Sequence, residues 1–168
     1  VVVPEGSNVL ESATIAGGRL FCQYLVDVAS EVRIFSLAGA MHGSLALPEF
    51  ASVADMGGRE RGDELFYIVT STLLPPAVFR YDTATGHVTA LDTARPVFDP
   101  TAYATRRVFC KSKDGTDVPL FITARKGLVR DGSHPTWLYG YGGFSISMTP
   151  TYRNDLPAWL EMGGVFVR

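Results

Sequence analysis

Short apolar runs separated by turn residues dominate the first 97 residues of the chain. Helical periodicity, in which apolar residues recur every three or four positions, is almost absent there. Strands are predicted at residues 9–15, 19–26, 32–37, 44–47, 64–71, 77–81 and 88–91. Such runs, spaced about 8–12 residues apart with turn signals between them, are typical of an all-β sandwich, barrel or propeller.

Two sequence features of this region recur after about 45 residues. Leu20-Phe21 reappears as Leu65-Phe66, and the segment 35–39 recurs loosely as 81–86. Repeats of about 40–50 residues, each with four short strands, are the signature of β-propeller blades. The alternative is a β-sandwich with recurrent hairpins. We predict two blades, which cannot close a ring by themselves.

The pattern changes at the turn-rich segment 92–100, which contains two prolines. Strands are predicted at 107–112 and 117–124, and Asp114-Gly115 between them predicts a hairpin with a type I′ turn. A polar loop at 127–135 then leads into a strand at 136–139 and a glycine-rich turn.

A short helix and a final strand complete the second half. Asn154 or Asp155 is the predicted helix cap, and Gly163-Gly164 ends the helix. Pro157 lies in the tolerant first turn, and one buried face is predicted for Leu156, Trp159, Leu160 and Met162. The run 165–167 is typical of a strand buried in a mostly parallel sheet. This order of elements indicates the opening of an α/β layer fold.

Composition and charge exclude several classes of protein. Of the 168 residues, 46% are hydrophobic and 19% are charged, which indicates a soluble globular chain. The net charge of −2 provides no electrostatic footprint for nucleic acid or for an anionic membrane surface. No apolar run approaches the roughly 18 residues of a membrane span. We therefore expect neither nucleic acid nor a membrane as a partner.

The cysteines indicate the cellular compartment of the protein, and the chain ends indicate whether the sequence is a fragment. Cys22 and Cys110 are too few for a disulfide framework, so we expect free thiols in a reducing compartment. The expected location is the cytoplasm, with the periplasm left open because the first residue is not methionine. The chain starts at Val1 and stops on a strand-like segment, so we expect both ends to be cut.

Candidate chemistry lies in residues 137–144, Trp-Leu-Tyr-Gly-Tyr-Gly-Gly-Phe. Glycines let the backbone adopt positive φ and come close to a ligand. The phenol of Tyr141 is protonated at neutral pH and can donate a hydrogen bond to a developing oxyanion. The alternative is a tyrosine that packs at the end of a strand.

Other chemistry-bearing residues form no recognisable site. None of His42, His87 and His134 has a carboxylate and a nucleophile at a spacing that would indicate a catalytic histidine. Ser145 and Ser147 are not framed by a Gly-x-Ser-x-Gly elbow. Acidic residues show no metal-ligand spacing, so we expect no metal and no other cofactor.

The second half resembles the prolyl oligopeptidase family, continuously from about Val108 to Phe144 and more faintly elsewhere. The residues that carry the resemblance are Ser112-Lys113-Asp114-Gly115-Thr116, Val118-Pro119, Lys126-Gly127, Asp131-Gly132-Ser133-His134-Pro135, Leu138 to Phe144, Thr149-Pro150 and Met162-Gly163-Gly164. Oligopeptidase B, in the same superfamily, has a similar tyrosine-glycine turn. The ending Gly142-Gly143-Phe144 is more similar to the prolyl enzymes.

The resemblance implies a mixed fold, an incomplete β-propeller followed by the opening strands and helix of an α/β-hydrolase domain. Residues 1–97 would form the last two or so of seven blades, and 98–168 the N-terminal part of the catalytic domain. The whole would be a monomeric serine peptidase that cleaves short proline-containing peptides after proline.

Site residues follow from the same resemblance. Tyr141 matches the oxyanion-hole tyrosine, and Phe144 matches a residue that lines the substrate pocket. The family's serine, aspartate and histidine would lie beyond Arg168, so this chain alone is expected to be inactive. Two alternatives stay open: a non-catalytic propeller module that docks to a partner, and a peptidase of the same superfamily with another specificity, such as one similar to oligopeptidase B.

Overall fold

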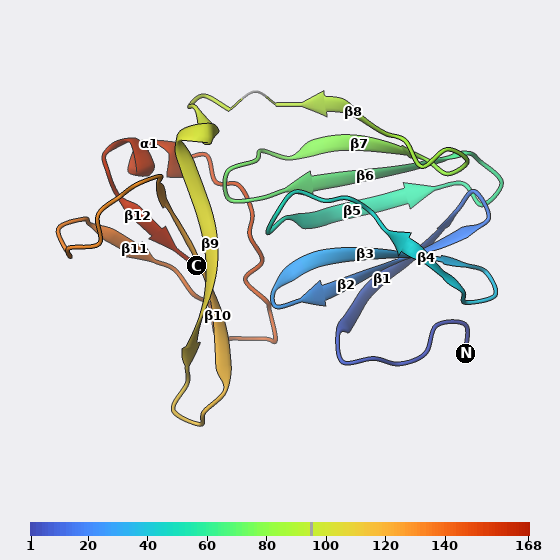
Figure 1. Ribbon diagram of the computed structural model, residues 1–168, viewed down its shortest axis with the longest axis horizontal. Coiled ribbons are helices and arrows are strands. Elements are labelled where there is room, and N and C mark those ends of the chain that lie inside the picture. The colour runs from blue at the N-terminus through green and yellow to red at the C-terminus, as the bar shows by residue number, and fades with distance from the viewer. Residues whose placement is uncertain (95) are drawn as a thin grey trace.

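The computed structural model describes residues 1–94 and 96–168. Arg95, which falls in the predicted turn-rich segment 92–100, lies outside the described residues. Three four-stranded sheets make up most of the structure, two of them side by side and the third beside them with the helix α1 (Figure 1). Within the described ranges, every helix is too short or too polar to cross a membrane.

The first two sheets are antiparallel meanders that follow one another along the chain. Their strand orders are β1-β2-β3-β4 and β5-β6-β7-β8, so each strand pairs with its neighbours in sequence. Two successive four-stranded meanders agree with the predicted pair of blades. The strands are β1 (Val9–Ala16), β2 (Arg19–Val26), β3 (Ala29–Ser36), β4 (Met41–Ser44), β5 (Ser52–Gly58), β6 (Glu64–Thr70), β7 (Ala77–Asp82) and β8 (Val88–Thr93).

The sequence prediction was wrong at β4 and incomplete at β5. The strand predicted at 44–47 lies earlier, because β4 ends at Ser44 and only the N–H of Leu45 continues the pairing, to the carbonyl of Val32. Strand β5 was not predicted. Its acidic residue Asp55 and its glycines Gly57 and Gly58 interrupt the apolar pattern on which the prediction depended.

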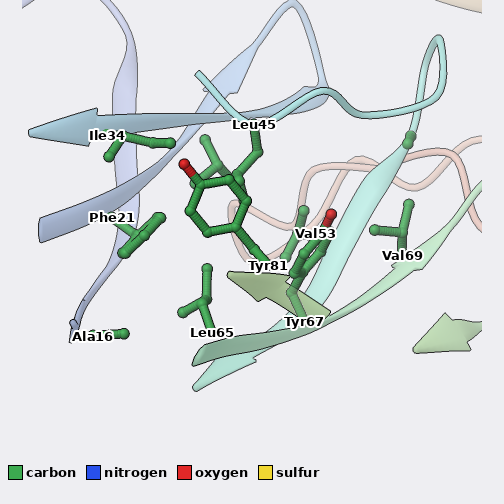
Figure 2. Packing of buried hydrophobic residues seen from close by; sticks show 11 residues of the cluster. Ala16, Phe21, Ile34, Leu45, Val53, Leu65, Tyr67, Val69 and Tyr81 are labelled. Carbon is green, nitrogen blue, oxygen red and sulfur yellow. The ribbon is translucent and has the colours of Figure 1, made fainter. Parts of the chain in front are cut away.

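The main core lies between the two meanders (Figure 2). Phe21 and Val32 from the first sheet and Leu65 and Val69 from the second are each 0% exposed. The ring of Tyr81 meets Phe21 edge-on, with 5.7 Å between ring centroids. Burying a side chain of this size stabilises a fold by about 1.5–3 kcal/mol, so this apolar layer fixes one sheet against the other.

The 45-residue repeat corresponds to equivalent positions on β2 and β6. Leu65 on β6 packs against the preceding sheet, and its equivalent Leu20 packs on the matching face of β2, beside Tyr24 and Phe35. Phe21 faces the following sheet, whereas its equivalent Phe66 is 40% exposed. Each repeat therefore presents one face backward and one forward, as stacked propeller blades do.

The third sheet is mixed, with strand order β11-β12-β10-β9. A single-turn 3-10 helix, η1 (Pro100–Ala102), leads into the antiparallel hairpin of β9 (Tyr103–Lys111) and β10 (Asp117–Arg125). Strand β12 (Val165–Val167) pairs antiparallel with β10 and parallel with β11 (Thr136–Leu138). The predicted parallel relationship of the last strand is therefore found only between β11 and β12.

The β9–β10 hairpin forms where it was predicted, but its turn is of another type. Among the turn residues only Gly115 has a positive φ, of +86°. The N–H of Gly115 donates to the carbonyl of Ser112, and the N–H of Ser112 donates to the carbonyl of Thr116. This is a type I turn followed by a left-handed glycine, so the predicted type I′ turn was wrong. Because this turn is longer, its backbone does not have to match the twist of the two strands as a two-residue turn does.

Helix α1 (Leu156–Glu161) is shorter than predicted. Leu156 and Leu160 are buried, in a cluster with Phe166 of β12. Met162 is 72% exposed, so its predicted place on the buried face was wrong: the helix ends at Glu161, and Gly163, with a φ of +86°, reverses the chain. Asp155 is the N-cap residue, but its carboxylate pairs with Arg153 at 2.7 Å instead of capping the helix.

Candidate active site

The glycine-rich turn begins at the carboxyl end of β11. The N–H of Tyr139, directly after this strand, donates to the carbonyl of Val167 at 2.8 Å, which holds the turn beside the end of β12. The carboxyl ends of the two parallel strands therefore lie at one edge of the sheet. In open α/β sheets this edge is where ligands bind.

Tyr141 lies in this turn and opens onto a hollow. Its side chain is 47% exposed, and its ring folds back over Gly143, where an added Cβ would lie 3.4 Å from the hydroxyl oxygen. The hollow has a volume of about 500 Å³. Its lining is mainly apolar and comes from Val28, Val118, Pro119, Leu120, Phe121, Leu138, Tyr139, Gly140, Tyr141, Gly142, Met148 and Arg168. Tyr141 is therefore part of the wall of the hollow, with its half-exposed ring above Gly143.

Among the described residues of that lining, Arg168 alone is charged. It is half-buried, and its Nη1 donates to the Thr151 hydroxyl at 2.6 Å. Burial lowers the pKa of Arg168 and the nearby Arg153 lowers it further, while Tyr139 acts in the opposite direction. Because a guanidinium stays charged in proteins, Arg168 places a fixed positive charge in the lining of this mainly apolar hollow.

Phe144 and Ser145 hold the end of the glycine turn in an unusual conformation. Their φ angles are +55° and +53°, a left-handed region that costs an ordinary residue roughly 1–2 kcal/mol. The Phe144 side chain is 89% exposed and is not part of the lining around Tyr141. The structure therefore brings Tyr141 to the hollow but leaves Phe144 on the surface beside it. Its role as a pocket residue stays a prediction.

Other residues weighed in the sequence lie apart from this hollow. Ser145 and Ser147 are exposed, and the ring Nδ1 of His134 lies 3.3 Å from the carbonyl oxygen of Gly163. Across residues 1–94 and 96–168, no three histidine, cysteine or acidic side chains come together as metal ligands.

Sequence reasoning missed most of the lining of the hollow. Val28 comes from the turn between β2 and β3, about 90 positions before Val118, and Met148 lies beyond the glycine turn. These residues have no motif of their own. Only the packing of the first sheet against the third brings Val28 to Tyr141, so no local signal pointed to it.

Comparison with known proteins gives a consistent result. Residues 1–94 match the family model described as "Prolyl oligopeptidase, N-terminal beta-propeller domain". Among curated relatives, a prolyl endopeptidase of Elizabethkingia meningoseptica is 34% identical over 165 residues, which is 98% of this chain and 23% of the relative. A prolyl endopeptidase of Elizabethkingia miricola is 33% identical over 150 residues, 89% of this chain and 21% of that protein.

Solved structures agree over almost the whole chain. One, from a structural and mechanistic study of two prolyl endopeptidases, superposes with a TM-score of 0.91 and 38% identity, over 99% of this chain and 25% of the other. Prolyl oligopeptidase B from Galerina marginata, bound to a 35-residue substrate of hydrolysis and macrocyclisation, superposes with a TM-score of 0.86 and 29% identity, over 99% of this chain and 24% of the other. The chain thus spans about a quarter of the length of the proteins it matches.

Proposed function

Because the chain belongs to the prolyl oligopeptidase family, we propose that it is part of a serine peptidase that hydrolyses short peptides after proline. Residues 1–97 would provide two blades of the propeller, and 98–168 would open an α/β-hydrolase domain. The mixed sheet supports this division. Across it the strands lie in the order β9-β10-β12-β11, so the last two are exchanged relative to their order in the chain, and the parallel pair of β11 and β12 ends beside the hollow.

The proposed role of Tyr141 is to stabilise the oxyanion. In a serine peptidase the nucleophile attacks the scissile carbonyl, a histidine takes the serine proton, and negative charge develops on the carbonyl oxygen. The serine and histidine would come from outside this chain. The Tyr141 O–H would donate to that oxygen, and the apolar lining of the hollow would strengthen the bond by excluding water. The observation that carries the proposal is the half-exposed phenol at the carboxyl edge of the parallel strands.

Phe144 would then help to bind the substrate. The Phe144 ring is 89% exposed beside the hollow, so a peptide that covers it removes apolar surface from water, which favours binding. A proline ring of the substrate has the size and apolar character for such a contact.

The test uses the protein at full family length and compares Tyr141→Phe with Tyr152→Phe. Removing one oxyanion donor lowers kcat by roughly 10²–10³-fold, and we expect this for Tyr141→Phe with little change in KM. Tyr152 packs in the cluster of Leu156 and Leu160 and is not part of the lining of the hollow, so its loss of a hydroxyl is the matched control.

The two variants are assayed on a proline-containing peptide whose cleavage step limits the rate. An unchanged kcat for Tyr141→Phe would refute the role of the phenol. Labelling of the unmodified protein by a fluorophosphonate separates a peptidase from a non-catalytic propeller module, because only an activated serine reacts.

A further inference from the structure

The turn between β2 and β3 has a conformation that its sequence does not favour. Asp27 and Val28 connect the paired residues Val26 and Ala29, and both have positive φ, +46° and +64°. Such two-residue turns favour Asn-Gly or Gly-Gly. A β-branched residue with positive φ is an outlier, because its Cβ substituents crowd the backbone.

The preceding hairpin of the same sheet shows the usual solution. Gly17 and Gly18 connect β1 to β2 with φ angles of +55° and +66°. The same turn geometry thus occurs twice in one blade, once with two glycines and once with Asp27-Val28. A strained residue that persists where glycine would fit indicates a function for its side chain.

The Val28 side chain has such a place, in the wall of the hollow beside Tyr141. It is half-buried, and among residues 1–94 and 96–100 it is the one residue in that lining. The rest of the wall comes from residues 118–168. The blade therefore contributes one apolar contact to a cavity that the third sheet otherwise builds.

Arg107 of β9 holds this turn against the third sheet. Its Nη1 donates to the carbonyls of Asp27 at 3.3 Å and Val26 at 3.4 Å, and its Nη2 lies 3.4 Å from the Asp27 carboxylate. The guanidinium also lies 5.4 Å from the centroid of the Phe50 ring, which in turn meets Phe121 of the hollow edge-on at 5.6 Å.

We propose that Val28 determines specificity: it contacts the peptide bound beside Tyr141 and favours substrates with a large apolar side chain at that contact, while Arg107 positions it. The inference rests on the proposed peptidase function. The bound peptide would thus contact both parts of the chain, Val28 of the blade and the third-sheet residues of the same lining.

The experiment uses full-length protein with Val28→Gly, Arg107→Lys and the control Arg80→Lys. Arg80 is partly buried like Arg107 and pairs with Glu64 at 3.0 Å, but this pair lies within the second sheet, away from the β2–β3 turn that Arg107 contacts. Substrates are proline-containing peptides in which the residues flanking proline vary from glycine to leucine and phenylalanine. The readouts are kcat and KM for each peptide, and the thermal midpoint of each variant.

Val28→Gly should leave the thermal midpoint unchanged or raise it, because glycine relaxes the turn. It should lower the preference for leucine or phenylalanine over glycine by roughly tenfold in kcat/KM, mainly through KM. Arg107→Lys should change the preference in the same direction by a smaller factor, and Arg80→Lys should leave it unchanged.

Three results would overturn the inference. The first is an unchanged preference in a Val28→Gly enzyme that still cleaves peptides. The second is a lower thermal midpoint with an equal loss on every peptide, which would make Val28 a structural residue only. The third is a wild-type protein that cleaves no proline-containing peptide, in which case the proposed function fails as well. An active wild-type enzyme with unaltered selectivity in the variant refutes only the role of Val28.

Discussion

Alanine at Gly17 or at Gly18 provides a direct test of how the two meanders pack. Both glycines have left-handed φ angles, so alanine meets the same backbone penalty at each. Their surroundings differ. A Cβ on Gly17 would overlap the Thr83 side chain just after β7, lying 2.6 Å from its Cβ, whereas a Cβ on Gly18 meets nothing within 4 Å.

The expected losses in the free energy of unfolding differ accordingly. Left-handed alanine costs roughly 1–2 kcal/mol, and Gly18→Ala should show this loss alone. Gly17→Ala adds overpacking, which typically costs about 1–3 kcal/mol, so a total of roughly 2–5 kcal/mol is expected. Thr83 is 4% exposed and its overlapping Cβ cannot move by side-chain rotation, so the full steric cost should appear.

Urea unfolding followed by far-UV circular dichroism measures these losses. Thr83→Gly removes all three atoms that the new methyl group would meet. The double variant Gly17→Ala/Thr83→Gly should therefore lose less stability than the sum of its single variants. Equal losses at Gly17 and Gly18, or strict additivity in the double variant, would show that the contact between the sheets is not packed as described.

Three further predictions concern the cysteines and the cluster of Leu156, Leu160 and Phe166. Cys22 is 1% exposed and burial raises the pKa of its thiol, so a disulfide reagent at pH 8 should modify the exposed Cys110 first and Cys22 only on unfolding; equal rates would contradict this. Because burial favours the neutral Cys22 thiol, its contribution to the free energy of unfolding is complete below the ordinary thiol pKa and is lost as the pH rises through the higher folded pKa. Cys22→Ala should weaken this alkaline dependence in urea titrations at several pH values. Leu160→Ala should lower the free energy of unfolding by roughly 2–5 kcal/mol, measured by the fluorescence of Trp137 and Trp159; a loss below 1 kcal/mol would show that the site is not tightly packed.

Much of the fold was predictable because sequence patterns within a few residues determine where its strands and turns lie. Strand β2 was predicted with its observed bounds, and the run 165–167 was correctly predicted as a strand, although its sheet is mixed and not mostly parallel. The 45-residue repeat pointed to two meanders. In each case the apolar alternation or the spacing of turns is set within a few residues, so the sequence alone contains the signal.

The failures arose where distant contacts decide the structure. Strand β5 contains glycines and an aspartate, and it forms because β6 offers a paired edge and because Val53 enters the core between the sheets. The exposed Met162 shows the opposite error, a helical pattern extended past the point where Gly163 ends the helix.

The candidate site divides in the same way. Tyr141 could be put forward as a candidate from its glycine-rich setting, but the hollow beside it could not be predicted, because its wall includes Val28. No pattern near residue 28 points to residue 141. The sequence does contain an anomaly, a valine in a turn that favours glycine. Its place in the wall of the hollow is found only when the third sheet is packed beside the β2–β3 turn.

Energetic magnitudes explain how that anomaly can persist. Left-handed Val28 costs roughly 1–2 kcal/mol, while a hydrogen bond from a charged donor contributes about 1.5–3 kcal/mol at good geometry. The two bonds from Arg107 are long, at 3.3 and 3.4 Å, and half of the Asp27 side chain is exposed, so values near or below the low end apply. Such contacts are sufficient to offset the strain but leave little surplus. Stability alone therefore gives no reason to prefer valine to glycine in this turn, and the side chain is best explained by what it contacts in the hollow.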